Sequence, residues 1–444
     1  MSIDQPEPPR TPYRDRIAIL PGDPPIAYRP RVVLVDEAVR TDIGGGGTPV
    51  FVASGSEQPD GDPPFGQWYR LGDVDDAPGL VDELTRRGQN AQLDIVYFAS
   101  DADCCGCPPH PAMAAQIAAD GWGANPWRAN PWRANPWRAN PGELNVVATG
   151  KPPTSSVMPA PFRTLPDRPA HSANNVVIGI LDSGLAGGRT NADTMRPNLL
   201  GTDPASLKRI AGQSDRPSRP IGQYPADRYL DPVAGHGTFI AGIIEQLTPG
   251  CTMQVRRVFE PDGDVSVLTL AVQLWLLMET MHPQIVNFSF GGTGRDRLFE
   301  LVIDHYHRGH DVVFVGAAGN EGSCVEQYPA ALESVIGVAA LGPTGPAEWS
   351  NYGPWVDACA PGTDIVSSFF ARFDGATPPI NGIDTDDFVQ WATWSGTSFA
   401  APVVVAALAR EMVTTSCSAA EAVKRVVRAP HLARLAFMGT IVNF

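Results

Sequence analysis

Residues 175–184 have the sequence NVVIGILDSG, in which an unbroken apolar run ends at Asp182. An apolar, β-branched run of this kind is typical of a strand buried on both faces of a parallel sheet. Asp182 then stands at the carboxyl end of that strand, and Gly184 permits the sharp turn that must follow. Because Asp before Gly is common in ordinary turns, Asp182 alone is equally compatible with a structural and a chemical role.

The pattern of this stretch continues downstream. Further buried strands are predicted at 255–258, 285–290 and 312–315, and helices at about 236–246, 266–281 and 398–412. Ser418 and Glu421 form a candidate capping box that opens a last helix. Alternating strands and helices predict an α/β fold, a doubly wound and mostly parallel sheet with helices on both faces. Functional residues of such folds lie at the carboxyl ends of the strands.

Two other Gly-framed motifs carry chemistry. Residues 235–238 (GHGT) place His236 at a predicted helix start, where small neighbours leave the imidazole unobstructed. Residues 396–402 (GTSFAAP) place Ser398 at another helix start, where backbone N–H groups and the helix dipole favour developing negative charge. Pro402 is expected in the first turn of that helix, where a missing N–H is tolerated. An isolated histidine is more often structural, so the combination matters more than each motif.

The chain order Asp182, His236, Ser398 resembles that of the subtilase family. A fourth motif, residues 316–322 (GAAGNEG), supplies Asn320 at the position of the oxyanion-hole residue of the family, although an Asn after Gly is also an ordinary turn residue. The family usually has Met where Phe399 stands and a small hydroxyl residue where Ala401 stands. Both changes are apolar and leave the nucleophile intact. The resemblance covers residues 171–430.

The resemblance implies a serine endopeptidase. Ser398 would attack a peptide carbonyl, His236 would act as base and then acid, Asp182 would orient the imidazole, and Asn320 would stabilise the oxyanion. This chemistry requires no metal or other cofactor. Structural calcium is frequent in the family, but no loop of this sequence indicates it.

Residues 286–292 (VNFSFGG) resemble the substrate-binding strand of the family, which would pair with a polypeptide substrate through backbone hydrogen bonds. The loop at 261–265 would flank the other edge of the peptide. The residues predicted to wall the pocket before the scissile bond are Ser289, Phe290, Gly291, Ala317, Ala318 and Gly319. Because most of these are small, the pocket could be wide. Phe290 and Glu321 could influence which substrate side chain the pocket prefers, but they do not decide between aromatic and basic side chains.

Four regions are predicted along the chain. Residues 1–30 form a Pro-rich arm, and residues 31–110 a small α/β unit with strands at 31–35 and 93–98 and a helix at 77–87. Residues 111–170 form a linker, and residues 171–444 the catalytic domain. The small unit resembles the inhibitory prodomain of the family in size, position and pattern. We therefore expect self-inhibition, with self-cleavage removing about 120–170 residues.

Residues 124–141 repeat the five-residue unit ANPWR three times and end in ANP. Proline in every unit excludes a regular helix and favours an extended linker or a series of turns. Each repeat also pairs Trp with Arg, a combination typical of interface anchors. Two interpretations therefore stay open, a linker with incidental Trp and an arm that docks on a partner or on this protein itself.

Residues 104–110 (CCGCPPH) could hold zinc, but the spacing lacks the two-residue gap of common zinc motifs, so a Pro-capped loop is favoured. His305, His307 and His310 cluster at a predicted helix end, which favours a solvated cationic face over a ligand set. The odd number of cysteines, seven in all, argues against a disulfide framework, although one disulfide in the catalytic region stays open.

The bulk composition narrows the partners. The 444 residues carry 33 basic and 48 acidic side chains, a net charge of −15, which argues against nucleic acid and anionic membranes as partners. The sequence lacks both an apolar run of roughly 18 residues and an N-terminal signal pattern, which predicts a cytoplasmic protein. Two alternatives remain, a dedicated protease that matures one peptide or partner, and a catalytically silent binding protein with the subtilase fold.

Overall fold

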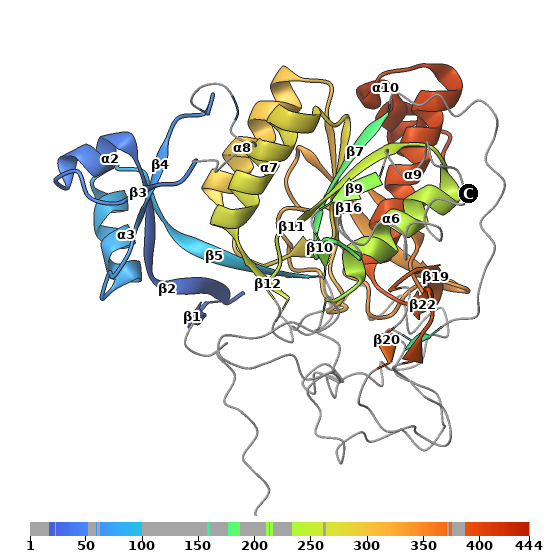
Figure 1. Ribbon diagram of the computed structural model, residues 1–444, viewed down its shortest axis with the longest axis horizontal. Coiled ribbons are helices and arrows are strands. Elements are labelled where there is room, and N and C mark those ends of the chain that lie inside the picture. Colours follow the sequence, from blue (N-terminus) through green and yellow to red (C-terminus); the bar gives the residue numbers. More distant parts are fainter. Residues whose placement is uncertain are drawn as a thin grey trace, which may run out of the picture.

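The computed structural model describes residues 17–22, 24–51, 59, 63–99, 158–159, 176–186, 210–212, 214–215, 233–260, 263–370, 373–374 and 387–443. Figure 1 shows the arrangement of these residues as successive layers of sheet and helix. The predicted linker at 111–170, apart from residues 158–159, and the motifs at 104–110 and 124–141 lie outside the described residues.

A largely parallel sheet forms the centre of the molecule, in the order β23-β24-β18-β16-β15-β13-β7-β11-β9. Its strands are β7 (Val177–Asp182), β9 (Ile210–Gly212), β11 (Thr252–Arg257), β13 (Ile285–Phe288), β15 (Val313–Ala317), β16 (Val335–Gly342), β18 (Ala358–Pro361), β23 (Arg434–Leu435) and β24 (Gly439–Ile441). β7 pairs in parallel with both β11 and β13. The strands predicted at 175–181, 255–258 and 312–315 are confirmed, with boundaries shifted by a few residues. The strand predicted at 285–290 ends at Phe288, and Phe290 and Gly291 form a separate short strand in another sheet.

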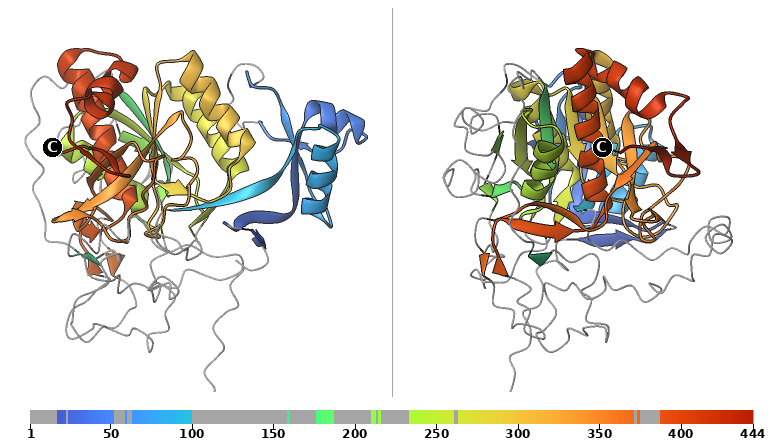
Figure 2. Two further views of the ribbon diagram at one scale, coloured as in Figure 1. Left: turned by 180° about the vertical axis from the view of Figure 1, so that it is seen from behind. Right: turned by 90° about the vertical axis from the view of Figure 1, so that its right-hand side faces the viewer.

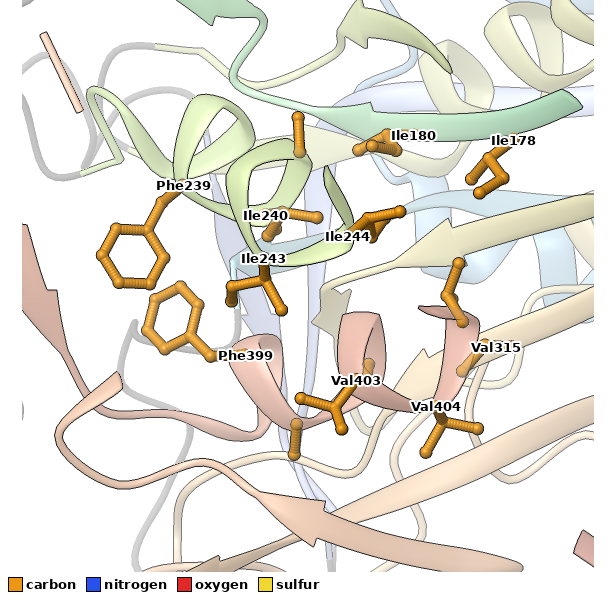
Figure 3. Close-up of a cluster of buried hydrophobic side chains, with 14 of the residues drawn as sticks. Ile178, Ile180, Phe239, Ile240, Ile243, Ile244, Val315, Phe399, Val403 and Val404 are labelled. Atoms are coloured by element: carbon orange, nitrogen blue, oxygen red, sulfur yellow. The ribbon is translucent and has the colours of Figure 1, made fainter. Parts of the chain in front are cut away.

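Helices cover both faces of this sheet, which confirms the predicted α/β class (Figure 2). On one face lie α6 (His236–Leu247), α9 (Thr397–Thr415) and α10 (Ala419–Val423), and on the other α7 (Val267–Met281) and α8 (Arg297–Gly309). Side chains of β7 alternate between the faces, so that Ile178 and Ile180 join the core with α6 and α9, and Leu181 joins the core with α7. Figure 3 shows the first of these cores.

The apolar helix α9 would be long enough to cross a membrane, but 72% of its apolar window is buried. It packs against β15, β16 and β18 as a core helix. The predicted helix start is confirmed, because the Ser418 hydroxyl accepts a hydrogen bond from the Glu421 N–H as the N-cap of α10. The Glu421 carboxylate pairs with Arg425 and Lys424. A π-helical turn, Lys424–Arg428, follows α10.

Short strands complete the same part of the chain. They are β6 (Met158–Pro159), β8 (Leu185–Ala186), β10 (Ser214–Asp215), β17 (Gly345–Pro346), β19 (Ile365–Ser368), β20 (Phe373–Asp374), β21 (Asp387–Phe388) and β22 (Trp391–Trp394). β22 lies between β19 and β6 in a separate three-stranded sheet. This small sheet places Trp394 just before the start of α9.

Residues 17–99, here called the N-terminal segment, form an antiparallel sheet with two helices. The strands are β1 (Ala18–Leu20), β2 (Ile26–Asp36), β3 (Thr48–Pro49), β4 (Trp68–Leu71) and β5 (Ala91–Ala99), and the helices α2 (Glu37–Asp42) and α3 (Ala77–Arg86). β1 and the first part of β2 lie within the stretch predicted as a loose arm. They are ordered here because Leu20, Ile26 and Tyr28 pack against the second hydrophobic core.

β5 joins the two parts of the molecule (Figure 1). It pairs antiparallel with β2 within the N-terminal segment, and with β12 (Asp264–Ser266) and β14 (Phe290–Gly291) beyond it. α7 and α8 consequently lie between the central sheet and the sheet of the N-terminal segment, with Trp275 of α7 at 5.7 Å from the Phe51 ring.

Candidate active site

The acidic residue and the histidine of the predicted site are in direct contact. Asp182 is the last residue of β7, and His236 is the first residue of α6. His236 Nδ1 lies 2.8 Å from Asp182 Oδ1 and 3.0 Å from Oδ2, and both side chains are completely buried. Because an ionised carboxylate can only accept, this pair places the imidazole proton on Nδ1 and makes Nε2 the basic nitrogen.

Local backbone features bring the start of α6 against the end of β7. Gly235 precedes the helix with φ +79°, a left-handed conformation that favours glycine. A Cβ on Gly237 would stand 2.4 Å from the Gly184 carbonyl oxygen, so only glycine permits this approach. The Ser183 hydroxyl accepts a hydrogen bond from the Gly237 N–H at 3.1 Å. Glycine at 237 and the Ser183 cap therefore set the distance between acid and imidazole.

Ser398 is the second residue of α9, and its side chain is completely buried. Its hydroxyl donates to the Ser289 carbonyl oxygen at 3.3 Å, and the Ser289 hydroxyl donates to the Ser398 carbonyl oxygen at 2.8 Å. Pro402 lies inside α9 and not in the first turn as expected. Since proline has no N–H for the carbonyl four residues earlier, Ser289 replaces that donor.

Asn320 follows β15 in the loop that faces the start of α9. Its Oδ1 accepts two hydrogen bonds from Thr397, one from the backbone N–H and one from the hydroxyl, each at 2.9 Å. The same hydroxyl accepts from the Gly319 N–H at 3.0 Å. With Oδ1 engaged in this way, Nδ2 is the end of the amide that can donate to a developing anion. The role of Thr397 was not predicted from the sequence, in which its only signal is its position next to Ser398.

The pocket residues predicted from the sequence lie on two segments of the chain. Ala317 ends β15, and the loop Ala318 and Gly319 leads to Asn320. The two alanines are completely buried, and the Ala318 carbonyl oxygen accepts from Asn351 Nδ2 at 2.9 Å. Glu321, considered a specificity residue, also receives a hydrogen bond from Asn351, at 2.5 Å.

Phe290 and Gly291, which follow Ser289, pair with the N-terminal segment. Phe290 of β14 pairs with Ala99 of β5, and Gly291 pairs with Phe98. On the other side of β5, the Ala99 N–H donates to the Gly263 carbonyl oxygen at 3.0 Å, and Asp264 pairs with Phe98. β5 therefore lies between the two edges that were predicted to hold a peptide. Of the predicted flanking loop, residues 261 and 262 lie outside the described residues.

Tyr97 of β5 inserts its side chain among the aromatic residues behind β14. Its ring stacks on Phe290 with centroids 6.4 Å apart and an interplanar angle of 27°. The buried Tyr97 hydroxyl donates to the Gly294 carbonyl oxygen at 2.9 Å. Phe290, which was predicted to influence substrate preference, thus contacts the Tyr97 side chain of the same chain.

Polar side chains of β5 reach the N-termini of the two helices beneath it. Gln92 Oε1 accepts from the Leu298 N–H at 3.2 Å, and Gln92 Nε2 donates to Asp296 Oδ2 at 2.7 Å. Asp94 Oδ1 accepts from the Leu268 N–H at 3.4 Å. Burial raises the pKa of Asp94 to about 6, although the positive charge of Arg29 lowers it in part. Burial also raises the pKa of Asp296 to about 7.

A cavity of about 410 Å³ opens beside this interface, lined by Arg29, Arg70, Asp94 and Glu260 among others. Arg29, which lines this cavity, forms an ion pair of 2.5 Å with Asp264, whose side chain is completely buried. Within the described ranges, no three His, Cys, Asp or Glu side chains gather as a metal site requires. The predicted His cluster occupies the last turn of α8, with His310 as its C-cap.

A family model described as "Subtilase family" matches residues 173–428. The "Thermostable alkaline protease" of Halalkalibacterium halodurans is 31% identical over 34% of this chain and 45% of its own length. The "Thermophilic serine proteinase" of a Bacillus species is 30% identical over 40% of this chain and 43% of its own length. The match thus spans less than half of each relative. A solved structure, "Crystal structure of a cold adapted subtilisin-like serine proteinase", aligns with a TM-score of 0.45 at 19% identity, over 63% of this chain and 94% of that chain.

Proposed function

Because the chain belongs to the subtilase family, we propose that it is a serine endopeptidase whose nucleophile is Ser398. The observation that carries the proposal is the buried contact between Asp182 and His236, at the same end of the sheet as Ser398 and Asn320. Four groups of complementary chemistry converge there, although they lie on four separate segments of the chain. The named serine proteases among the relatives support the same activity.

In the proposed reaction, the Ser398 hydroxyl turns from the Ser289 carbonyl oxygen towards His236 Nε2. Oγ attacks the peptide carbonyl carbon as the proton moves to Nε2, and Asp182 stabilises the resulting imidazolium. The imidazolium then protonates the leaving amine, and the C–N bond breaks. Water releases the acyl group by the same steps. Asn320 Nδ2 and the backbone N–H of Ser398 stabilise the oxyanion, so that all proposed proton transfers use groups of the protein.

We also propose that the N-terminal segment inhibits this site. β5 pairs with β14 and β12 as an added strand, the mode in which an extended peptide would bind to an exposed sheet edge. A substrate would need the same backbone groups of Phe290, Gly291 and Gly263. β5 therefore competes with substrate. Its last residue, Ala99, pairs with Phe290, next to the Ser289 that is hydrogen-bonded to Ser398. A cut by Ser398 is then expected within the few residues after Ala99, earlier than the sequence pattern suggested.

Activity of the full chain and of its Ser398→Ala variant tests the proposed function. A fluorophosphonate probe should label the wild type and not the variant, and only the wild type should degrade unfolded casein. Labelling without casein degradation would favour a dedicated processing protease. Absence of both, after the N-terminal segment has been removed by an added protease, would contradict the proposal and favour a silent binding protein.

A further inference from the structure

The imidazole of the proposed base forms a nearly equilateral triangle with two other aromatic rings. The His236 and Trp394 centroids are 5.3 Å apart with an interplanar angle of 83°, and those of His236 and Phe399 are 5.2 Å apart at 54°. The Trp394 and Phe399 centroids are 5.1 Å apart. Trp394 is 2% exposed and Phe399 is completely buried. The imidazole thus contacts two aromatic rings, which also contact each other, and it contacts Asp182 through Nδ1.

The core fixes the two rings in turn. Phe239 of α6 lies 4.7 Å from Phe399 and 5.8 Å from Trp394, measured between ring centroids. Figure 3 shows the Phe239 and Phe399 rings facing each other between α6 and α9. Because Phe239 follows His236 by three residues and Phe399 directly follows Ser398, this packing links the helix of the base to the helix of the nucleophile.

We propose that Trp394 and Phe399 are positioning residues for His236. They hold the imidazole in the orientation that keeps Nδ1 on Asp182 while Nε2 exchanges a proton with Ser398. This inference rests on the proposed function, since it assigns how the base of that site is held.

Three physical effects support this role. The edge-to-face contact with Trp394 and the tilted contact with Phe399 both resist rotation of the imidazole. Apolar rings keep water from the Asp182–His236 bond, and a hydrogen bond in such surroundings is electrostatically stronger. When His236 becomes an imidazolium during turnover, neighbouring π systems also attract its charge. A flexible, non-aromatic side chain at position 399 would resist rotation of the imidazole less than Phe399 does.

The test compares Trp394→Leu and Phe399→Leu with a matched control, Phe388→Leu. Phe388 is equally buried but contacts Phe369, at 4.6 Å between centroids. We expect the two test variants to lose about 10- to 100-fold in kcat with little change in KM, since misplacing a reacting group by about 1 Å costs this much. The control should keep kcat although it loses thermal stability. Trp394→Phe and Phe399→Tyr should restore most of the rate.

A second measurement reports on the base without requiring turnover. In the Ser398→Ala background, the low-field proton resonance of His236 Nδ1–H should persist in Phe388→Leu and broaden by faster exchange in the two test variants. Unchanged kcat and an unchanged resonance in both test variants would refute the positioning role. If the wild type shows no activity but the resonance responds as expected, the proposed function is wrong, while the positioning of the imidazole by Trp394 and Phe399 is supported.

Discussion

Ser289 and Ser398 exchange two hydrogen bonds, each hydroxyl donating to the backbone carbonyl oxygen of the other residue. The first bond holds the proposed nucleophile at rest, and the second satisfies the carbonyl that Pro402 leaves without its helical donor. Both residues are completely buried, so a lost donor is not replaced easily by water. The strand predicted to bind substrate is consequently tied through Ser289 to the helix of the proposed nucleophile.

Ser289→Ala should lower the free energy of unfolding by about 1–3 kcal/mol, because the Ser398 carbonyl becomes a buried unsatisfied acceptor. Thermal unfolding in the Ser398→Ala background would measure this loss without self-digestion. Adding Pro402→Ala supplies a helical N–H to the same carbonyl and should recover part of the loss. Equal stability of the single and double variants would contradict the assigned role of Ser289.

Thr397→Val should reduce kcat more than it changes KM. The substitution removes the hydroxyl that holds Asn320 Oδ1 and leaves the backbone N–H bond, so the amide is oriented less firmly. The loss should be smaller than that of Asn320→Ala, for which the loss of about 100- to 1000-fold established for the corresponding asparagine of subtilisin is the reference. Steady-state kinetics on one peptide substrate would measure both, and Thr397→Ser should retain the wild-type rate.

Intact mass should show that the wild type is cut within the few residues after Ala99, while Ser398→Ala stays at 444 residues. The pairing of Ala99 with Phe290 and the bond from its N–H to Gly263 set this position. A cut at about 120–170, or none in either protein, would contradict the assigned inhibitory arrangement of β5. Phe98→Pro, which removes a backbone donor from β5, should weaken docking of the N-terminal segment.

Docking of the N-terminal segment should weaken as pH rises from about 4 to 7. Burial raises the pKa of Asp94 to about 6 and that of Asp296 to about 7, so the docked state binds more protons than the undocked state at intermediate pH. The stabilising contribution of the protonated forms is present near pH 4 and lost once the pH exceeds these values. Thermal melting of Ser398→Ala across this range would measure the slope.

Asp94→Asn is the matched variant for the pH series. Its amide oxygen can still accept from the Leu268 N–H, but the side chain no longer ionises. The slope between about pH 4 and 6 should therefore become shallower, while the part due to Asp296 remains from about pH 4 to 7. A profile identical to that of the parent would show that Asp94 does not contribute to the pH dependence.

Sequence patterns were sufficient for much of the fold. The apolar runs at 255–258 and 312–315 and the helix at 77–87 correspond to β11, β15 and α3. Local order in residues 17–30 was missed because Pro-rich composition suggests an arm, whereas packing of Ile26 and Tyr28 on a distant core stabilises strands there. Thr397 and Trp394 were missed for a related reason, since neither has a distinctive local pattern.

The sequence by itself predicted the acid, base and nucleophile that we propose and the strand ends and helix starts on which they lie, because apolar periodicity and Gly-framed motifs act over a few residues. Tertiary structure alone decided the contacts across the site. Ser289 and Ser398 are separated by 109 positions, and Ala99 meets Phe290 from another part of the fold. Such contacts depend on how strands pair and helices pack, which no local pattern specifies. The triangle of His236, Trp394 and Phe399 has the same origin, because the start of α6 meets the segment of β22 and α9 only through tertiary packing.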